Sequence, residues 1–378
     1  MNIFLERLRR CISPDKSLTC LIALLCPVVL TFIGLVVLAS ASLSFYRSES
    51  LFFRQLFWLL ISLIFFLIGA FLDLDFVRRH IAKILVAFSV LLILVLIPGI
   101  GRSVNGSRRW ISIAGINFQV SEFAKIVLIM WLANYISLAR GEIKLFVRGM
   151  VKPFAVAACT SGLILLEPDY GTAILLGGVS ISLLFLYGVR IFYIVGAVVA
   201  ALISVSVLIF FNPVRMHRIL AFMDIDSNKL GGAYQLWQGI LGFASGGLWG
   251  NGVGNGKQQL VYLPEAHTDF ILPILGEEFG SVAVVFVLAL YLTFSITCIV
   301  QAMRIKSTYH SAISCGIALL VAYQVIINVG VVCGLLPTKG MVLPFISYGG
   351  SNLLAIYLML GILLNCFLFD QNFSTKAE

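Results

Sequence analysis

Charged side chains are scarce in this sequence. Only 11% of its 378 residues are Asp, Glu, Lys or Arg, whereas hydrophobic residues make up 60%. Soluble domains carry about 25% charged and about 45–50% apolar residues, so an ordinary soluble globular protein is excluded. We expect a protein embedded in a membrane, with no nucleic acid among its partners.

Paired cysteines and an extended polar domain are also lacking. None of the eight cysteines forms a Cys-x-x-Cys pair, and most lie inside apolar runs. We interpret them as small buried hydrophobic residues rather than as metal ligands or disulfides. The longest stretch outside the apolar runs, about 212–270, is rich in glycine, and we expect it to form turns and close backbone approaches.

Long apolar runs dominate the remainder of the chain. A membrane span needs roughly 20 apolar residues, and continuous runs of this kind favour helices over a barrel. The sequence predicts an all-α polytopic membrane protein with about ten transmembrane helices. We place one membrane domain over 1–370 and a short C-terminal tail over 371–378. The spans are predicted near 19–43, 51–71, 81–99, 122–139, 153–166, 171–188, 191–211, 271–302, 311–333 and 351–369.

The distribution of Lys and Arg predicts the orientation. The first apolar run is too long for a signal peptide, so we interpret it as a span behind a basic tail. Most Lys and Arg then fall in inner segments if both termini lie inside the cell. This topology makes 212–270 an outer loop between spans seven and eight.

One polar cluster stands at the outer edge of a span. Glu265, His267 and Asp269 precede the apolar run that starts the eighth span. Titratable groups are costly at a membrane edge, so a functional site is the first interpretation. Asp269 is alternatively a helix N-cap. Two acids and one histidine are too few to establish a metal, so a divalent cation remains an option and no other cofactor is expected.

Further polar residues have a structural and a functional interpretation each. Arginines at 102, 108 and 109 suit either lipid head groups or an anionic substrate, since guanidinium binds phosphate through two parallel bonds. Glu122 and Lys125, three residues apart on one helix face, form either a structural ion pair or part of a polar cavity. The break at 167–171 is expected to bring Asp169 to that cavity. Consecutive Glu277 and Glu278 are expected to point about 100° apart.

Several segments together resemble the SEDS family of bacterial cell-wall polymerases. In chain order they are Asn105-Gly-Ser-Arg-Arg-Trp110, Gln119-Val-Ser-Glu-Phe-Ala-Lys125, Glu167-Pro-Asp-Tyr-Gly-Thr172, Ser245-Gly-Gly-Leu-Trp-Gly250, Leu263-Pro-Glu-Ala-His-Thr-Asp-Phe270, Gly276-Glu-Glu278 and the run from Leu336 to Ser351. The segments at 264–270 and 336–340 are more similar to the division member of the family than to the elongation member. Pro273, at the start of the eighth span, departs from the family pattern and is expected to kink that helix.

The resemblance implies a glycosyltransferase that polymerises lipid II, a disaccharide-pentapeptide on a polyprenyl diphosphate, on the outer face of the bacterial cytoplasmic (inner) membrane. It implies that Asp269 is the catalytic base. The expected substrate-binding residues are Arg102, Asn105, Arg108, Arg109, Glu122, Lys125, Asp169, Glu265, His267, Glu277, Lys339 and Ser347.

The resemblance also implies partners: a class B penicillin-binding protein that crosslinks the strands, and other membrane proteins of the division complex. Three alternatives stay open. One is a lipid II flippase, which needs the charged cavity but no base. Another is an elongation polymerase, and the third is a non-catalytic scaffold that recruits a transpeptidase.

Overall fold

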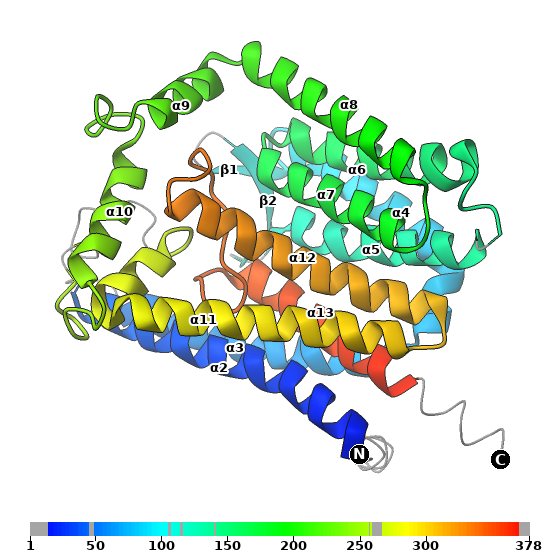
Figure 1. Ribbon diagram of the computed structural model, residues 1–378, viewed down its shortest axis with the longest axis horizontal. Coiled ribbons are helices and arrows are strands. Elements are labelled where there is room, and N and C mark those ends of the chain that lie inside the picture. The colour runs from blue at the N-terminus through cyan, green and yellow to red at the C-terminus, as the bar shows by residue number, and fades with distance from the viewer. Residues whose placement is uncertain are drawn as a thin grey trace.

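The structure is a computed structural model of the whole chain, and it describes residues 14–44, 49–104, 107–113, 116–139, 141–256, 258 and 267–369. Two predicted site residues, Asn105 and Glu265, lie outside these ranges, as does the predicted tail at 371–378. Most of the described chain forms long helices that run side by side along one axis (Figure 1).

The predicted polytopic helical fold is confirmed. Eight helices are long and apolar enough to cross a membrane, and two shorter apolar helices, α7 and α8, accompany them among the described residues. The chain is therefore a multi-pass membrane protein. The long helices are α2 (Pro14–Ser44), α3 (Glu49–Phe71), α4 (Leu74–Leu96), α5 (Val120–Leu138), α6 (Lys152–Leu166) preceded by the π-helical turn η1 (Phe146–Val151), α11 (Ile271–Arg304), α12 (Thr308–Val332) and α13 (Gly350–Phe369). The shorter pair is α7 (Tyr170–Leu186) and α8 (Ile191–Phe210).

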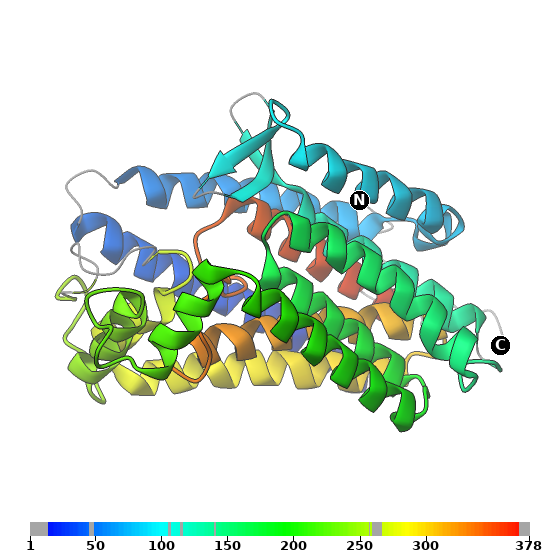
Figure 2. The ribbon, with the colours of Figure 1, turned by 90° about the horizontal axis from the view of Figure 1, so that it is seen from above.

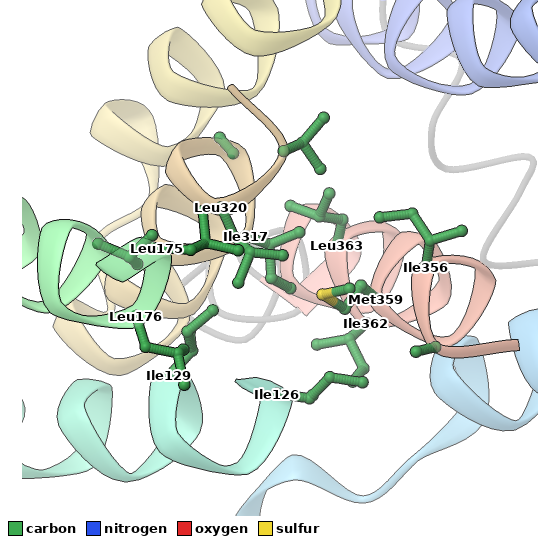
Figure 3. Close-up of a cluster of buried hydrophobic side chains, with 14 of the residues drawn as sticks. Ile126, Ile129, Leu175, Leu176, Ile317, Leu320, Ile356, Met359, Ile362 and Leu363 are labelled. Atoms are coloured by element: carbon green, nitrogen blue, oxygen red, sulfur yellow. The ribbon is translucent and has the colours of Figure 1, made fainter. Parts of the chain in front are cut away.

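Helices α5, α7, α12 and α13 form the centre of the bundle. The apolar window of α13 is 94% buried, whereas that of α3 is only 11% buried. Figure 3 shows the apolar side chains of these four central helices meeting in one cluster. Peripheral helices keep large hydrophobic side chains on the surface, as a lipid-facing helix requires. The labelled members of the cluster are Ile126, Ile129, Leu175, Leu176, Ile317, Leu320, Ile356, Met359, Ile362 and Leu363.

Small residues bring α3 and α13 into close contact. A Cβ added at Gly361 would lie 2.1 Å from the Phe66 carbonyl oxygen, and one at Gly69 would lie 2.4 Å from the Leu358 oxygen. Membrane helices gain stability from such close backbone approach, since lipid is as apolar as their side chains. This contact fixes α13 against the first half of the bundle.

A small antiparallel sheet follows α4, where the sequence suggested only a loop. Its strands are β1 (Gly101–Val104), β2 (Ser107–Ile113) and β3 (Ile116–Gln119), in the order β1-β2-β3. Strand β3 runs directly into α5, and the Ser351 hydroxyl accepts a hydrogen bond from the Gln119 amide. Short strands carry too little apolar alternation to stand out beside long membrane helices, which explains the missed sheet.

Two helices stand in the predicted outer segment, α9 (Pro213–Met223) and α10 (Tyr234–Gly246). In Figure 1 they lie at the left, while α2 begins and α13 ends toward the right. Seen from above in Figure 2, α10 lies at the N-terminal end of α11. This arrangement agrees with an outer segment opposite both ends of the chain; the side that faces the cell interior stays a prediction.

The expected kink at Pro273 is wrong. Helix α11 keeps helical geometry there, and its only non-helical residue is Gly280, with φ of 80°. Pro273 is the third residue of α11, where a backbone N–H has no intrahelical acceptor, so proline removes no helical hydrogen bond. At Gly280 an added Cβ would lie 2.2 Å from the Leu248 oxygen, so close backbone contact requires glycine at the break.

Candidate functional site

The turn between α6 and α7 is held by one arginine from the sheet. Arg109 on β2 donates from Nε to the Glu167 carbonyl oxygen at 3.1 Å and from a terminal nitrogen to the Pro168 oxygen at 2.8 Å. Its other terminal nitrogen lies 3.7 Å from the Asp169 carboxylate. Two backbone carbonyls and one carboxylate therefore fix the guanidinium, and the sheet fixes the turn.

Asp169 caps α7. Its carboxylate accepts hydrogen bonds from the Thr172 amide at 3.2 Å and from the Thr172 hydroxyl at 2.8 Å. A carboxylate at a helix N-terminus satisfies amides that lack partners and interacts favourably with the helix dipole. Asp169 is thereby fixed in orientation, with Arg109 on its other side.

Lys339 reaches this turn from the loop between α12 and α13. An added Cβ at Gly171 would lie 2.4 Å from the lysine Cε, so glycine makes room for the stem. The ammonium lies 5.7 Å from the centre of the Tyr170 ring. Its nitrogen is buried and has no hydrogen-bond partner among the described residues.

Burial lowers the pKa of Lys339 to about 7, with Asp169 opposing this shift and Arg109, Arg215 and Arg218 reinforcing it. Burial is the largest cause because an ammonium loses its hydration there. Lys339 is therefore close to half protonated at neutral pH, and an arriving anion would favour its charged form.

Glu167 is a further buried acid in the same turn, one that the sequence analysis did not include among its site residues. It is fully buried, and neither carboxyl oxygen has a hydrogen-bond partner among the described residues. Burial and the Asp169 charge raise its pKa to about 8, against an opposing effect of Arg109. Its carboxyl is mostly protonated at neutral pH. We name Arg109, Glu167, Asp169 and Lys339 the entrance cluster.

Asp269 lies next to the Lys339 segment. Its Oδ2 would be 2.6 Å from a Cβ added at Gly340. The Asn328 side chain on α12 donates to the Asp269 carbonyl oxygen at 2.9 Å and to the Met341 oxygen at 2.6 Å. One amide group thus holds the start of α11 beside the loop that carries Lys339. The N-cap position of α11 belongs to Phe270, without a side-chain cap bond, so the capping interpretation of Asp269 is not favoured.

His267 and Ser347 build the same junction. The Ser347 hydroxyl donates to the Thr268 oxygen at 2.6 Å and accepts from the Leu343 amide at 2.8 Å. The Tyr348 amide donates to the His267 oxygen at 2.9 Å, and the two rings meet edge to face. The hydroxyl of Ser347 is therefore used in holding the backbone, and substrate binding by either residue stays a prediction.

Glu122 and Lys125 form a closed ion pair inside α5. The ammonium lies 2.9 Å from a carboxylate oxygen, and the two side chains are 6% and 1% exposed. A buried pair that satisfies itself agrees with the structural interpretation. A role of these two residues in substrate binding stays a prediction.

Glu277 and Glu278 contact different parts of the chain, as expected for consecutive helix positions. Glu277 accepts from the Ser245 hydroxyl at 3.3 Å and from the Gln258 amide at 3.1 Å. Glu278 accepts from the Gly254 amide at 2.8 Å and from the Ser40 hydroxyl. Both carboxylates thus hold the glycine-rich loop at 247–258, and we name them the loop anchor. Substrate binding by Glu277 stays a prediction.

The three predicted arginines separate in the structure. Arg102 donates to the Asn117 side chain at 3.2 Å and Arg108 to the Leu96 oxygen at 3.4 Å, and both are exposed. Of the three, only Arg109 contacts the α6–α7 turn. Arg108 precedes it on β2 and points to the opposite face, because neighbouring residues of a strand alternate.

A second arginine, missed by the sequence analysis, meets the cluster from outside. The Arg215 guanidinium on α9 stacks 3.1 Å from the centre of the Tyr170 ring. Nothing in the sequence connects residues so distant in the chain, although Tyr170 lies in one of the noted segments. Among the described residues no group of three His, Cys, Asp or Glu gathers as a metal site requires. The predicted set included Glu265, which lies outside them, so a divalent cation stays a prediction.

The fold and the site together define the class: this is a many-helix membrane protein with a polar cluster at one end of its helix bundle. Residues 19–372 match the model of the cell cycle protein family that comprises FtsW, RodA and SpoVE. The chain belongs to this family, which confirms the resemblance.

Relatives with known names agree. The chain is 39% identical over 350 residues to the probable peptidoglycan glycosyltransferase FtsW of Trichlorobacter lovleyi, covering 91% of this chain and 92% of that one. It is 38% identical over 348 residues to the protein of the same name from Coxiella burnetii, covering 90% and 94%.

Solved structures share the fold. One belongs to a peptidoglycan synthase complex that coordinates polymerization and crosslinking; it is 26% identical, covers 92% of this chain and 97% of its own, and has a TM-score of 0.77. The rod shape determining protein RodA of Thermus thermophilus is 26% identical with a TM-score of 0.69, covering 91% and 95%.

Proposed function

We propose that this chain is a peptidoglycan glycosyltransferase that polymerises lipid II on the outer face of the bacterial cytoplasmic membrane during cell division. The names of its relatives support the activity and the division role. The observation that carries the proposal is that the Asp269 carboxylate lies against Gly340. Gly340 directly follows Lys339 in the chain, and the Lys339 ammonium is buried without a hydrogen-bond partner among the described residues. A base and a cation are the two groups that glycosyl transfer to a hydroxyl requires.

The proposed reaction uses these groups in one displacement. Asp269 takes the proton from the 4-hydroxyl of the acceptor sugar, and the resulting oxygen nucleophile attacks the anomeric carbon of the donor. The bond from that carbon to the lipid diphosphate breaks, and the diphosphate leaves with the bonding electron pair. A positioned general base contributes about 10²–10⁴-fold to such a step.

The entrance cluster supplies charge for the leaving group. Lys339 is repelled by Arg109, and Asp169 is its opposing acid, while Glu167 is mostly protonated. The cluster therefore has excess positive charge and a lysine nitrogen with no bonded partner. A diphosphate would relieve the repulsion and keep Lys339 protonated as negative charge develops on the leaving oxygen.

A crosslinking partner is part of the proposal. A polymerase alone makes uncrosslinked glycan. One solved relative comes from a complex that coordinates the two activities. We therefore propose a complex with a class B penicillin-binding protein, within a set of other division membrane proteins. Co-purification and a higher polymerisation rate in the complex are expected; equal rates without co-purification would remove this part alone.

The decisive experiment is a polymerisation assay on purified lipid II with the wild type, Asp269→Asn and Asp226→Asn. Asp226 is a matched carboxylate in the outer segment, paired at 2.7 Å with Lys229. We expect glycan strands from the wild type and Asp226→Asn, and none from Asp269→Asn, although that variant still binds lipid II.

The same assay separates the flippase alternative. Its charged cavity needs no base, so lipid II movement across vesicles without any polymerisation by the wild type would support a flippase. Polymerisation by Asp269→Asn at the wild-type rate would remove Asp269 from the mechanism.

A further inference from the structure

A pocket of about 620 Å³ lies beneath α9, beside the entrance cluster but separate from it. Its lining comes from α9, from the start of α10 and from the loop before α13. The polar residues that line it are His217, Arg218, Tyr234, Gln235 and Thr338. None of them belongs to the predicted site or takes part in the proposed reaction.

The pocket is suited to an anion with hydrogen-bonding groups. Arg218 brings a permanent positive charge and His217 an imidazole ring, and no Asp or Glu is among the described residues that line it. Tyrosine, glutamine and threonine add donors beside this cation. A guanidinium binds a carboxylate through two parallel hydrogen bonds, which fixes the orientation as well as the affinity.

Its walls are tied to the reaction site at two points. Thr338 precedes Lys339 in the chain, so one wall continues directly into the entrance cluster. Arg215, one turn before Arg218 on α9, stacks on Tyr170 at the start of α7. A Cβ at Gly232 would lie 2.9 Å from the His217 Cε1, so glycine allows the ring to pack against that backbone.

The volume decides between two anionic parts of the substrate. Pockets of about 300–1,000 Å³ enclose molecules of drug size, which is far more than a diphosphate alone needs. A short peptide with a terminal carboxylate has both the bulk and the charge. Lipid II carries such a peptide on its disaccharide.

We propose that this pocket binds the carboxylate-bearing stem peptide of the substrate, with Arg218 holding a peptide carboxylate. The proposal rests on the proposed polymerase function, since it places one part of that substrate. The pocket sets which peptide is accepted, and it affects binding more than the chemical step.

The test compares three lipid-linked substrates: the full pentapeptide form, the same form with a carboxamide at its C-terminus, and the disaccharide without peptide. Polymerisation is measured for the wild type, Arg218→Gln and the control Lys229→Gln, whose cation lies in the same outer segment over Trp237 and outside the pocket. We expect Arg218→Gln to raise KM for the full substrate about tenfold at unchanged kcat. KM of the wild type should rise by about the same factor on the carboxamide substrate, and KM of Arg218→Gln should show no further rise on it.

Direct binding keeps this inference separate from the activity. Each substrate is titrated against wild-type and Arg218→Gln protein, with both also in the Asp269→Asn background. A peptide-dependent difference in affinity between wild-type and Arg218→Gln protein, with no polymerisation by the wild type, would support the pocket assignment and contradict the proposed function. An equal loss for the peptide-free and full substrates, or no loss for either, would overturn the stem-peptide assignment while leaving the polymerase intact.

Discussion

The loop anchor and the entrance cluster both bury charged groups, but they differ in what satisfies those groups. Glu277 and Glu278 accept hydrogen bonds from serine hydroxyls and from loop amides. Lys339 and the Glu167 carboxyl have no such partner among the residues the structure describes. The carboxylates of the loop anchor hold a loop through their hydrogen bonds, whereas the entrance cluster contains buried groups that can still form hydrogen bonds.

This difference distinguishes buried charged groups that stabilise the fold from buried charged groups that are available for a function. Native proteins satisfy the great majority of their buried polar groups, so an exception calls for a ligand or a catalytic role. By that criterion the loop anchor stabilises the fold, although it lies in a segment typical of the family. The entrance cluster keeps buried polar atoms without a partner among the described residues, so we predict that it binds a ligand.

Between these two regions, the largest expected effect is on activity in Lys339→Met. Removing the unpartnered ammonium should lower polymerisation about 10²–10³-fold, since it deletes charge stabilisation of the leaving group. The melting temperature should stay the same or rise, because a buried cation without a partner costs stability. Rate and thermal unfolding are measured beside Lys229→Met, which should retain activity. A wild-type rate in Lys339→Met would mean that the cluster is structural.

Glu278→Ala should reverse that pattern. It removes the carboxylate that accepts from the Gly254 amide and the Ser40 hydroxyl, which should lower stability by about 2–3 kcal/mol. Glu278→Gln, which still accepts, should lose less. Thermal unfolding is compared with the rate per folded molecule, and we expect the rate to persist. Loss of the rate in a fully folded Glu278→Gln would place this residue in the reaction instead.

Glu167→Gln should stabilise the protein in a pH-dependent way. Its carboxyl has a pKa of about 8 in the fold and 4.5 as the ordinary value, so its ionisation opposes folding. Below pH 4.5 both states are protonated and the wild type has no penalty; the penalty grows between pH 4.5 and 8 and is complete above pH 8. The gain of the variant should therefore increase from pH 5 to pH 8, reaching on the order of 4 kcal/mol. Melting curves at several pH values test this, and a constant difference would contradict it.

Gly340→Ala should give the smallest effect. The new methyl would lie 2.6 Å from the Asp269 Oδ2, so the carboxylate must shift. A displaced base lowers kcat, by about tenfold, without weakening substrate binding. Gly162→Ala is the matched control, because nothing lies within 4 Å of its added Cβ. An unchanged kcat would show that Asp269 adjusts its position freely.

The sequence was sufficient for the helices, and it indicated Asp269 as the candidate base. Span length and apolarity fix a membrane helix locally, and the segment around Asp269 is distinctive by itself. It was insufficient for the cluster, because contacts such as Lys339 with Gly171 join positions far apart in the chain. Glu167 was passed over for the same reason: only the fold reveals that its carboxyl is buried without a partner.

Arg109 illustrates how a residue acquires a different expected role once its contacts are known. Its type suggested a phosphate contact, yet its guanidinium binds the backbone of the α6–α7 turn. Side-chain chemistry limits what a residue binds, but the nearest acceptors decide what it does bind.

The stack of Arg215 on Tyr170 gives the outermost helix a mechanical connection to the reaction site. Helix α9 touches the start of α7 through that stack, and the same tyrosine lies 5.7 Å from the Lys339 ammonium. A protein that pushes on α9 from outside the membrane would move the aromatic ring and alter the electrostatic surroundings of the lysine without reaching it. With the outer segment on the cell surface, as the sequence predicts, we expect that control of the rate through α9 requires no movement of the membrane helices.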